Sequence, residues 1–114
     1  MVLVCGGVAS GKRTFVRSLG YEDADMSPTL REGTPVLVGL EELLRERELT
    51  ASELEGVLGR EVVVCLEMGQ GLVPIDGAQR AWRERVGRCC QLLAHEAKAV
   101  YRMVCGIAVC VKGD

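Results

Sequence analysis

The residues best suited to chemistry lie near the start of the chain, where residues 6–12 read G-G-V-A-S-G-K after the apolar residues 1–5. Gly6, four further residues, Gly11 and Lys12 fit the phosphate-loop pattern G-x-x-x-x-G-K-[ST] up to its last letter. In such a loop the glycines let backbone amides point at an anion, and the lysine reaches the outer phosphates as a point charge. The pattern therefore predicts a site for nucleotide phosphates. Its expected residues are Gly6, Gly7, Val8, Ala9, Ser10, Gly11, Lys12, Arg13 and Thr14.

The last letter of the pattern differs, because Arg13 stands where a Ser or Thr normally ligates Mg²⁺. Arginine has only donors and cannot ligate a metal, and Thr14 lies about 100° further round the expected helix. Arg13 is suited instead to neutralising phosphate charge. The sequence thus predicts no metal-ligating residue and leaves the need for Mg²⁺ open. A glycine-rich strand-to-helix turn that holds no ligand is the alternative interpretation.

Composition places the chain among globular domains. At 114 residues it is long enough for a core, and we expect residues 1–114 to form a single nucleotide-binding domain. A net charge of −2 gives no reason to expect nucleic acid or an anionic membrane as a partner. No apolar stretch reaches the roughly 18 residues of a membrane span. The first apolar run is also too short for a signal peptide, so we expect a cytoplasmic protein.

The six cysteines lack the spacing of a zinc site, since no C-x-x-C pair occurs. Cys5, Cys65, Cys105 and Cys110 lie in apolar, strand-like runs, where a reduced thiol behaves as a small hydrophobic group. We therefore expect buried free thiols and no structural metal.

Strand and helix patterns alternate along the chain. The expected strands are residues 1–5, 23–26, 35–38, 61–66, 100–105 and 107–111. The expected helices are residues 11–19, residues 40–48, a short one capped by Thr50 or Ser52, and residues 77–98. This order predicts an α/β fold with a mainly parallel sheet, helices on both faces and a C-terminal hairpin that turns at Gly106.

The longest expected helix, residues 77–98, has an apolar stripe with the 3-and-4 spacing of a core-facing side. Its members are Trp82, Val86, Cys89, Cys90, Leu93 and Ala97. The opposite side carries Arg80, Arg83, Glu84, Arg88, Gln91 and His95. We interpret the arginine cluster of this helix, Arg80, Arg83, Arg85 and Arg88, as a solvated face with helical partners such as Glu84 and Arg88, and His95 as a surface histidine. A phosphate or subunit contact by the arginines is the alternative.

Glu67 follows the expected strand 61–66 and therefore falls at the edge of the sheet where α/β proteins bind ligands. A glutamate at a strand end is either simply solvated or a partner for a metal, a water or an acceptor hydroxyl. The segment G-Q-G-L-V-P at residues 69–74 either permits a tight loop or belongs to the same site.

Three segments of the chain resemble one family. The opening V-L-V-C-G-G-V-A-S-G-K, the segment V-V-V-C-L-E-M-G-Q-G-L-V-P-I-D and the ending V-C-G-I-A-V-C-V-K are similar to the adenosylcobinamide kinase / adenosylcobinamide-phosphate guanylyltransferase family of cobalamin biosynthesis. The resemblance covers the first twenty residues and about residues 61–112. It matches Gly6, Gly7, Ser10, Gly11 and Lys12 to the family's phosphate loop, and Glu67, Gly69, Gly71, Val73 and Pro74 to its later E-V-G-x-G-I-V-P segment.

The resemblance implies a phosphate-loop fold of the recombinase-type ATPase kind, usually assembled as an oligomer, so we expect a homo-oligomer. The family phosphorylates the hydroxyl of adenosylcobinamide and then transfers GMP from GTP to that phosphate through a covalent histidine adduct. For this chain it implies GTP or ATP as the bound nucleotide and a cobinamide-type substrate. It also implies catalytic roles for Lys12 and Glu67.

This chain departs from the family at three points. Arg13 replaces the hydroxyl of the loop, Gly39 stands where the family has an acidic residue, and the segment that carries the guanylylated histidine is missing. The one histidine in the sequence is His95. If the chain is an enzyme, we therefore expect phosphoryl transfer rather than guanylyl transfer. A catalytically silent nucleotide- or phosphate-binding module with a regulatory or assembly role is the second hypothesis, and a fold remnant without nucleotide is the third.

Overall fold

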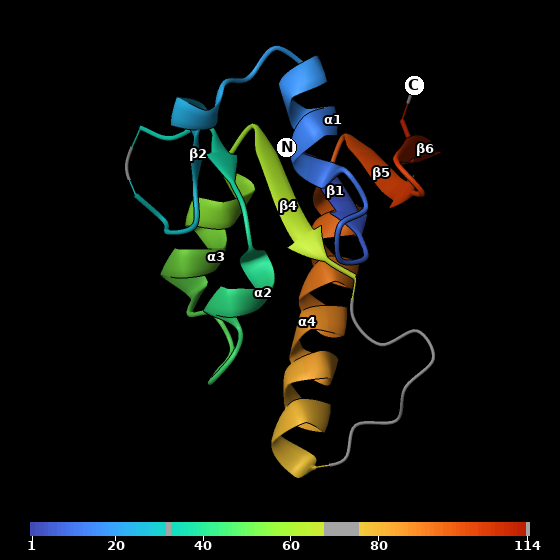
Figure 1. Ribbon diagram of the computed structural model, residues 1–114. Helices are drawn as coiled ribbons and strands as arrows, with labels where there is room; N and C mark the ends of the chain where they lie inside the picture. Colours follow the sequence, from blue (N-terminus) through green and yellow to red (C-terminus); the bar gives the residue numbers. More distant parts are fainter. Residues whose placement is uncertain (32, 68–75, 114) are drawn as a thin grey trace.

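A six-stranded sheet forms the middle of the computed structural model, which describes residues 1–31, 33–67 and 76–113 (Figure 1). The strands are β1 (Val2–Gly6), β2 (Met26–Ser27), β3 (Val36–Leu37), β4 (Val62–Leu66), β5 (Ala99–Val104) and β6 (Ile107–Lys112), in the order β2-β3-β4-β1-β5-β6. All neighbours are parallel except β5 and β6. The last residues of β1, β3, β4 and β5 therefore share one edge, called the carboxyl edge below.

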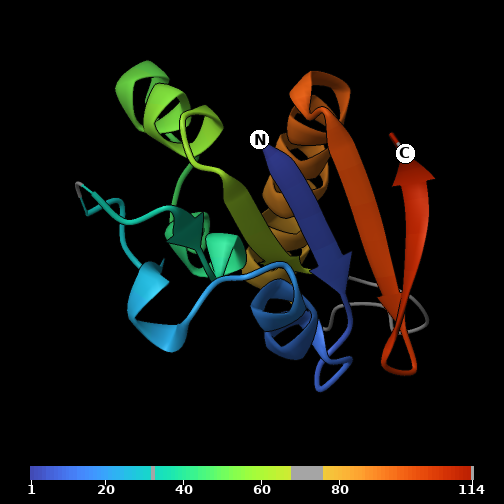
Figure 2. The ribbon, with the colours of Figure 1, turned by 90° about the horizontal axis from the view of Figure 1, so that it is seen from above.

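Helices cover both faces of this sheet, as the sequence predicts. The helices are α1 (Lys12–Ser18), η1 (Asp23–Asp25, a 3-10 helix), α2 (Leu40–Leu43), α3 (Ala51–Leu58) and α4 (Gly77–Glu96). Figure 2 shows α1 and α4 on opposite sides of β1 and β4. The fold is thus an α/β sandwich of the phosphate-loop kind with a C-terminal antiparallel hairpin.

Alternating side chains of β1 divide the core into two clusters. Leu3 joins a cluster with residues of α2, α3 and α4, whereas Val4 joins a second cluster that includes Val16 of α1. The apolar stripe expected for this helix is confirmed. Val86, Leu93 and Ala97, which follows α4 directly, are buried in the first cluster, and Trp82, Cys89 and Cys90 pack against it. Burying both faces of a parallel sheet explains why its strands are continuous runs of valine and leucine.

Two expected elements differ in the structure. The helix expected at residues 40–48 ends at Leu43, where the chain turns toward α3, and Arg85 Nε on α4 donates to the freed carbonyl oxygen of Leu44 at 2.8 Å. The strand expected at residues 23–26 is mostly η1, and only Met26 belongs to β2. The Asp25 carboxylate accepts from the backbone N–H of Glu22 at 2.8 Å, and such local hydrogen bonds compete with strand pairing.

The N-cap of α3 is Thr50 rather than Ser52. Its hydroxyl accepts from the backbone N–H of Glu53 at 3.1 Å, and the Glu53 carboxylate accepts from the N–H of Thr50 at 2.9 Å. This reciprocal pair is a capping box, and it satisfies two amides that the helix start would otherwise leave unpaired.

The final hairpin turns at Cys105 and Gly106, which have φ angles of 50° and 78°. Two left-handed residues form the type I′ turn that suits the twist of an antiparallel pair. Cys105 is exposed in this turn, and Cys110 is exposed on the outermost strand β6, so the expectation that both thiols are buried was wrong. Within the described ranges, no helix is long and apolar enough to cross a membrane.

Candidate phosphate-binding site

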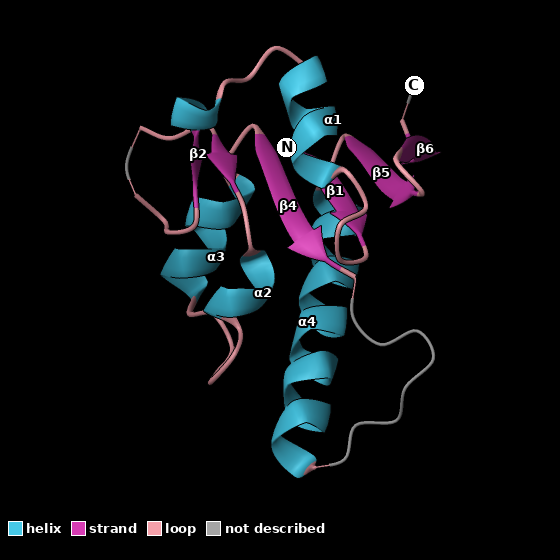
Figure 3. Cartoon of the chain, in the orientation of Figure 1, coloured by secondary structure: helices cyan, strands magenta, loops and turns pink. Residues whose placement is uncertain are grey.

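The loop between β1 and α1 lies at the carboxyl edge, beside the end of β4 (Figure 3). Ala9 has φ 56° and Gly11 has φ 88°, so two left-handed residues turn the chain back toward α1. Gly6 is held tightly at the end of β1, since an added Cβ would lie 2.6 Å from Ser10 Oγ and 2.9 Å from Met103 Cβ. The sequence of residues 6–11 therefore suits a compact loop whose amides are not covered by side chains.

The amine of Lys12 lies over this loop. Its Nζ donates to the carbonyl oxygen of Gly7 at 2.6 Å and lies 3.5 Å from Ser10 Oγ. A hollow of about 260 Å³ at the loop is lined by Ala9, Ser10, Gly11, Lys12, Arg13 and Thr14. A cation and backbone amides around one hollow are the groups that bind a phosphate.

The side chains of Val8, Arg13 and Thr14 are exposed. Arg13 lines the hollow, so its guanidinium is in place to neutralise an anion there. Thr14 lines the same hollow and a second one beside Phe15 and Gly106.

Glu67 lies directly beside the loop. Its backbone N–H donates to the carbonyl oxygen of Gly6 at 2.8 Å, which continues the pairing of β4 with β1 by one residue. Its carboxylate is held by Arg102, whose Nε lies 3.0 Å from Oε1 and 3.2 Å from Oε2. The other residues of the later motif, Gly69, Gly71, Val73 and Pro74, lie outside the described residues.

Two charged residues at the carboxyl edge have partners that the sequence did not predict, and one of them, Glu41, was expected to be solvated with the rest of the charged run at residues 41–48. Arg102 is the charged residue in the otherwise apolar β5, and that contrast was an available signal. Glu41 follows β3 by four residues, and its carboxylate accepts from the backbone N–H of Leu66 at 2.9 Å. The Glu41 carboxylate therefore lies at the end of β4. Gly39, the position at which the family has an acidic residue, is the N-cap of α2 and has a left-handed φ of 74°.

The cysteines near the carboxyl edge belong to the core. Burial, with smaller contributions from neighbouring charges, raises the pKa of Cys5 to about 11. Cys90 Sγ lies 3.5 Å from Cys65 Sγ, and hydrogen bonding to Cys90 together with burial raises the pKa of Cys65 far above its usual range. In the part of the chain that the structure describes, no three His, Cys, Asp or Glu side chains gather to hold a metal ion.

His95 lies far from the loop. It is exposed in the last turn of α4. Lys98, three residues further along, donates its backbone N–H to the carbonyl oxygen of Met1 at 3.0 Å. Met1 precedes β1, so His95 is at the opposite edge of the sheet from Gly6. Five residues of extended strand separate these edges by roughly 16 Å.

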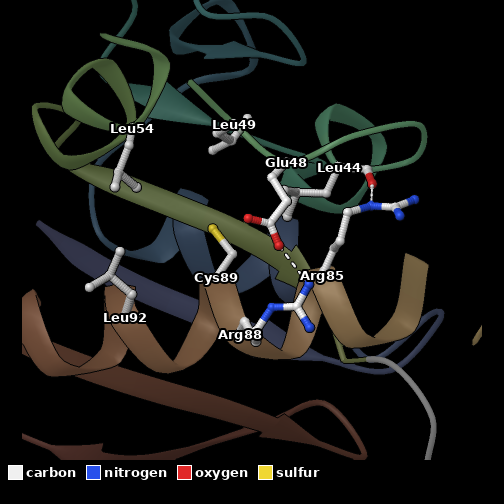
Figure 4. Close-up of a pocket in the computed structure, with 8 residues that line it drawn as sticks. All are labelled: Leu44, Glu48, Leu49, Leu54, Arg85, Arg88, Cys89 and Leu92. Atoms are coloured by element: carbon white, nitrogen blue, oxygen red, sulfur yellow. Dashed lines mark hydrogen bonds and ion pairs between the residues drawn. The ribbon is translucent and has the colours of Figure 1, made fainter. Parts of the chain in front are cut away.

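A second hollow, of about 190 Å³, lies on the α4 face of the sheet (Figure 4). Leucines from α3 and from the chain before it form its floor with Cys89 and Leu92 of α4. Arg88 pairs with Glu48 across its rim, rather than with Glu84 of its own helix as expected. This hollow shares no residue with the phosphate loop. Of its two arginines, Arg88 has a carboxylate partner, and Arg85 donates to the backbone carbonyl oxygens of Leu44 and Arg45.

The chain matches one protein family. Residues 31–111 match the model of a family described as cobinamide kinase / cobinamide phosphate guanyltransferase. The match covers well over half of the chain and includes residues 31–60, which lie between the segments with a visible resemblance. Residues 6–14 precede the match, so the phosphate loop depends on its own pattern and geometry. A comparison with curated proteins found no match.

Proposed function

Because the chain belongs to the cobinamide kinase / cobinamide phosphate guanyltransferase family, we propose that it binds a nucleoside triphosphate and phosphorylates a cobinamide-type hydroxyl. The nucleotide is GTP or ATP, and its phosphates lie on residues 6–14. Family membership supports this type of chemistry in cobalamin biosynthesis. The observation that carries the proposal for this chain is the position of Lys12, whose amine lies over a phosphate-type loop at the end of the central strand.

Phosphoryl transfer requires positioning and charge neutralisation rather than a covalent protein nucleophile. The acceptor oxygen forms a bond to the γ-phosphorus while the bond from that phosphorus to the bridging β–γ oxygen breaks. The nucleoside diphosphate then leaves, and the hydroxyl proton passes to solvent. Lys12 and the loop amides neutralise charge on the transferred group.

Glu67 orients the acceptor hydroxyl in this proposal. Its backbone lies beside Gly6, and its side chain is about one-third exposed at the same edge. A carboxylate has about four acceptor positions, so one held by Arg102 Nε can still accept from a hydroxyl.

Guanylyl transfer is not part of the proposal. In the family it needs a histidine nucleophile, and the histidine of this chain, His95, lies at the edge of the sheet opposite the loop. A histidine roughly 16 Å away cannot attack a phosphate held at residues 6–14.

A catalytically silent nucleotide-binding module is the second candidate. Arg13 in place of the loop hydroxyl and the pairing of Glu67 with Arg102 favour it, since both reduce what the site offers a metal ion. Such a module binds nucleotide and releases it unchanged.

We also propose that the chain assembles as a homo-oligomer. β6 is the last strand in the sheet order, and Ile107, Val109 and Val111 on it are exposed. Exposed branched side chains on an outer strand favour association. Sedimentation velocity of the wild-type chain and of Val109→Lys tests this, and a monomer at all concentrations would contradict it.

The test of the proposed reaction is product formation from cobinamide and γ-labelled GTP or ATP. We expect label in cobinamide with the wild-type chain, and none with Lys12→Ala. The matched control is Lys98→Ala, because Lys98 is an exposed lysine at the opposite edge of the sheet. Nucleotide binding without product would support the silent module, and equal turnover by Lys12→Ala would refute the role of the loop.

A further inference from the structure

Arg102 reaches across the end of the central strand. It lies on β5, where its register partner is Cys5 of β1, and Glu67 follows β4 on the other side of β1. The guanidinium Nε lies 3.0 Å and 3.2 Å from the two Glu67 carboxylate oxygens. The ion pair thus joins β5 to the end of β4 across β1, next to the first residue of the phosphate loop.

The charge of Lys12 acts on the same thiol, that of Cys5, as the two charges of this ion pair. Lys12, Glu67 and Arg102 all influence the pKa of the Cys5 thiol, with the glutamate raising it and the two cations lowering it. The Arg102 side chain is 47% exposed and that of Glu67 is 29% exposed, so both can meet a ligand at the carboxyl edge.

A carboxylate next to a bound triphosphate is unfavourable unless a cation lies nearby, because the like charges repel. Nucleotide sites usually supply a divalent cation for this purpose. The residues of this edge do not fit one: Arg13 replaces the ligating hydroxyl, and a metal at Glu67 would have to displace Arg102. The Glu41 carboxylate is held by the backbone N–H of Leu66.

We propose that Arg102 takes the place of the divalent cation at the carboxyl edge, so that this chain binds the triphosphate of its nucleotide without metal. Nε neutralises Glu67, and the guanidinium keeps further N–H donors for the terminal phosphate. The inference rests on the proposed function, because it needs a nucleotide on residues 6–14. Arg102 is thus a positioning residue for Glu67 and the phosphate, and it takes part in no further step of the reaction.

Calorimetric titration with GTP and with ATP, in EDTA and in excess MgCl₂, tests the inference on whichever nucleotide the wild type binds. We expect the wild-type affinity to be the same in both buffers. Arg102→Met should bind about tenfold or more weakly in EDTA, as for loss of a charge-assisted hydrogen bond, and Arg102→Lys should keep part of the affinity. Mg²⁺ should restore binding to Arg102→Met, because the freed Glu67 carboxylate can then face the metal. It should not restore binding to Arg102→Met/Glu67→Gln.

The matched control is Arg17→Met. Arg17 also pairs with a carboxylate through Nε, at 2.7 Å to Asp23, and it is 46% exposed. We expect this variant to bind the nucleotide like the wild type. Exposed ion pairs contribute little to folding, so all variants should unfold at similar temperatures.

The outcomes separate this inference from the proposed function. Wild-type binding that requires Mg²⁺, or unchanged binding by Arg102→Met in EDTA, would overturn the inference while leaving nucleotide binding in place. No GTP or ATP binding by the wild type in either buffer would overturn both.

Discussion

Replacing Gly6 with alanine tests the close approach of the loop to β5. The added Cβ would lie 2.6 Å from Ser10 Oγ, 2.9 Å from Met103 Cβ and 3.1 Å from Met103 O. Overpacking of this kind costs about 1–3 kcal/mol of unfolding free energy. Alanine also loses less entropy than glycine on folding, which offsets about 0.4–1 kcal/mol. We therefore expect a net loss of about 1–2 kcal/mol and a melting temperature lower by about 4–8 °C.

Thermal and urea unfolding followed by circular dichroism measure this loss, with Gly7→Ala as the matched control. Gly7 is the next residue, has no left-handed φ, and an added Cβ there meets nothing within 4 Å. We expect its stability to stay within about 0.5 kcal/mol of the wild type. Ser10→Ala should restore part of the stability of Gly6→Ala, because it removes the shortest contact. A Gly6→Ala variant as stable as the wild type would refute the packing described for the loop.

Three further predictions concern other features. Ala9→Gly should stabilise the chain by about 0.5–1 kcal/mol, because Ala9 has φ 56° and glycine adopts left-handed φ without steric cost; an unchanged urea midpoint would contradict this. In native thiol labelling read by mass spectrometry, the exposed Cys105 and Cys110 should react first, and the buried Cys65 only on unfolding; early labelling of Cys65 would contradict its placement. A hydrogen bond from Arg47 lowers the pKa of Glu53 from 4.5 to about 2. The contribution of the Glu53 carboxylate to stability is therefore complete above pH 4.5 and is lost as the pH falls toward 2. The difference in melting temperature between wild type and Glu53→Gln should therefore shrink over that interval, and a constant difference would contradict the ion pair.

Periodic patterns predicted most of the fold. The buried strands β1 and β4 and the long α4 have strong local signals, because a parallel sheet buries continuous apolar runs and an amphipathic helix repeats every three to four residues. The helix predicted at residues 40–48 is too long. The composition of these residues favours a helix throughout, but Arg85 donates to the carbonyl oxygen of Leu44 and so stabilises a helix that ends at Leu43.

The candidate site likewise has one part that the sequence predicts and one part that it does not. The phosphate loop is a local motif, so its residues could be named from their spacing alone. The partners of Glu67 could not, because Arg102 is 35 residues away and meets it only when β4 and β5 lie on either side of β1. Exposure of Cys110 was likewise decided by strand order, since β6 is the last strand and has a sheet neighbour on one side, whereas Cys105 is exposed because it lies in the hairpin turn.

We propose that residues 6–14 hold nucleotide phosphates with Lys12 over them. Calorimetric titration of GTP and ATP into the wild-type chain and into Lys12→Ala tests it most directly. We expect saturable binding of at least one nucleotide to the wild type. Binding to Lys12→Ala should be weaker by about tenfold or more, the effect of losing a charge-assisted hydrogen bond. Equal affinity in the two proteins, or no binding of either nucleotide to the wild type, would contradict it.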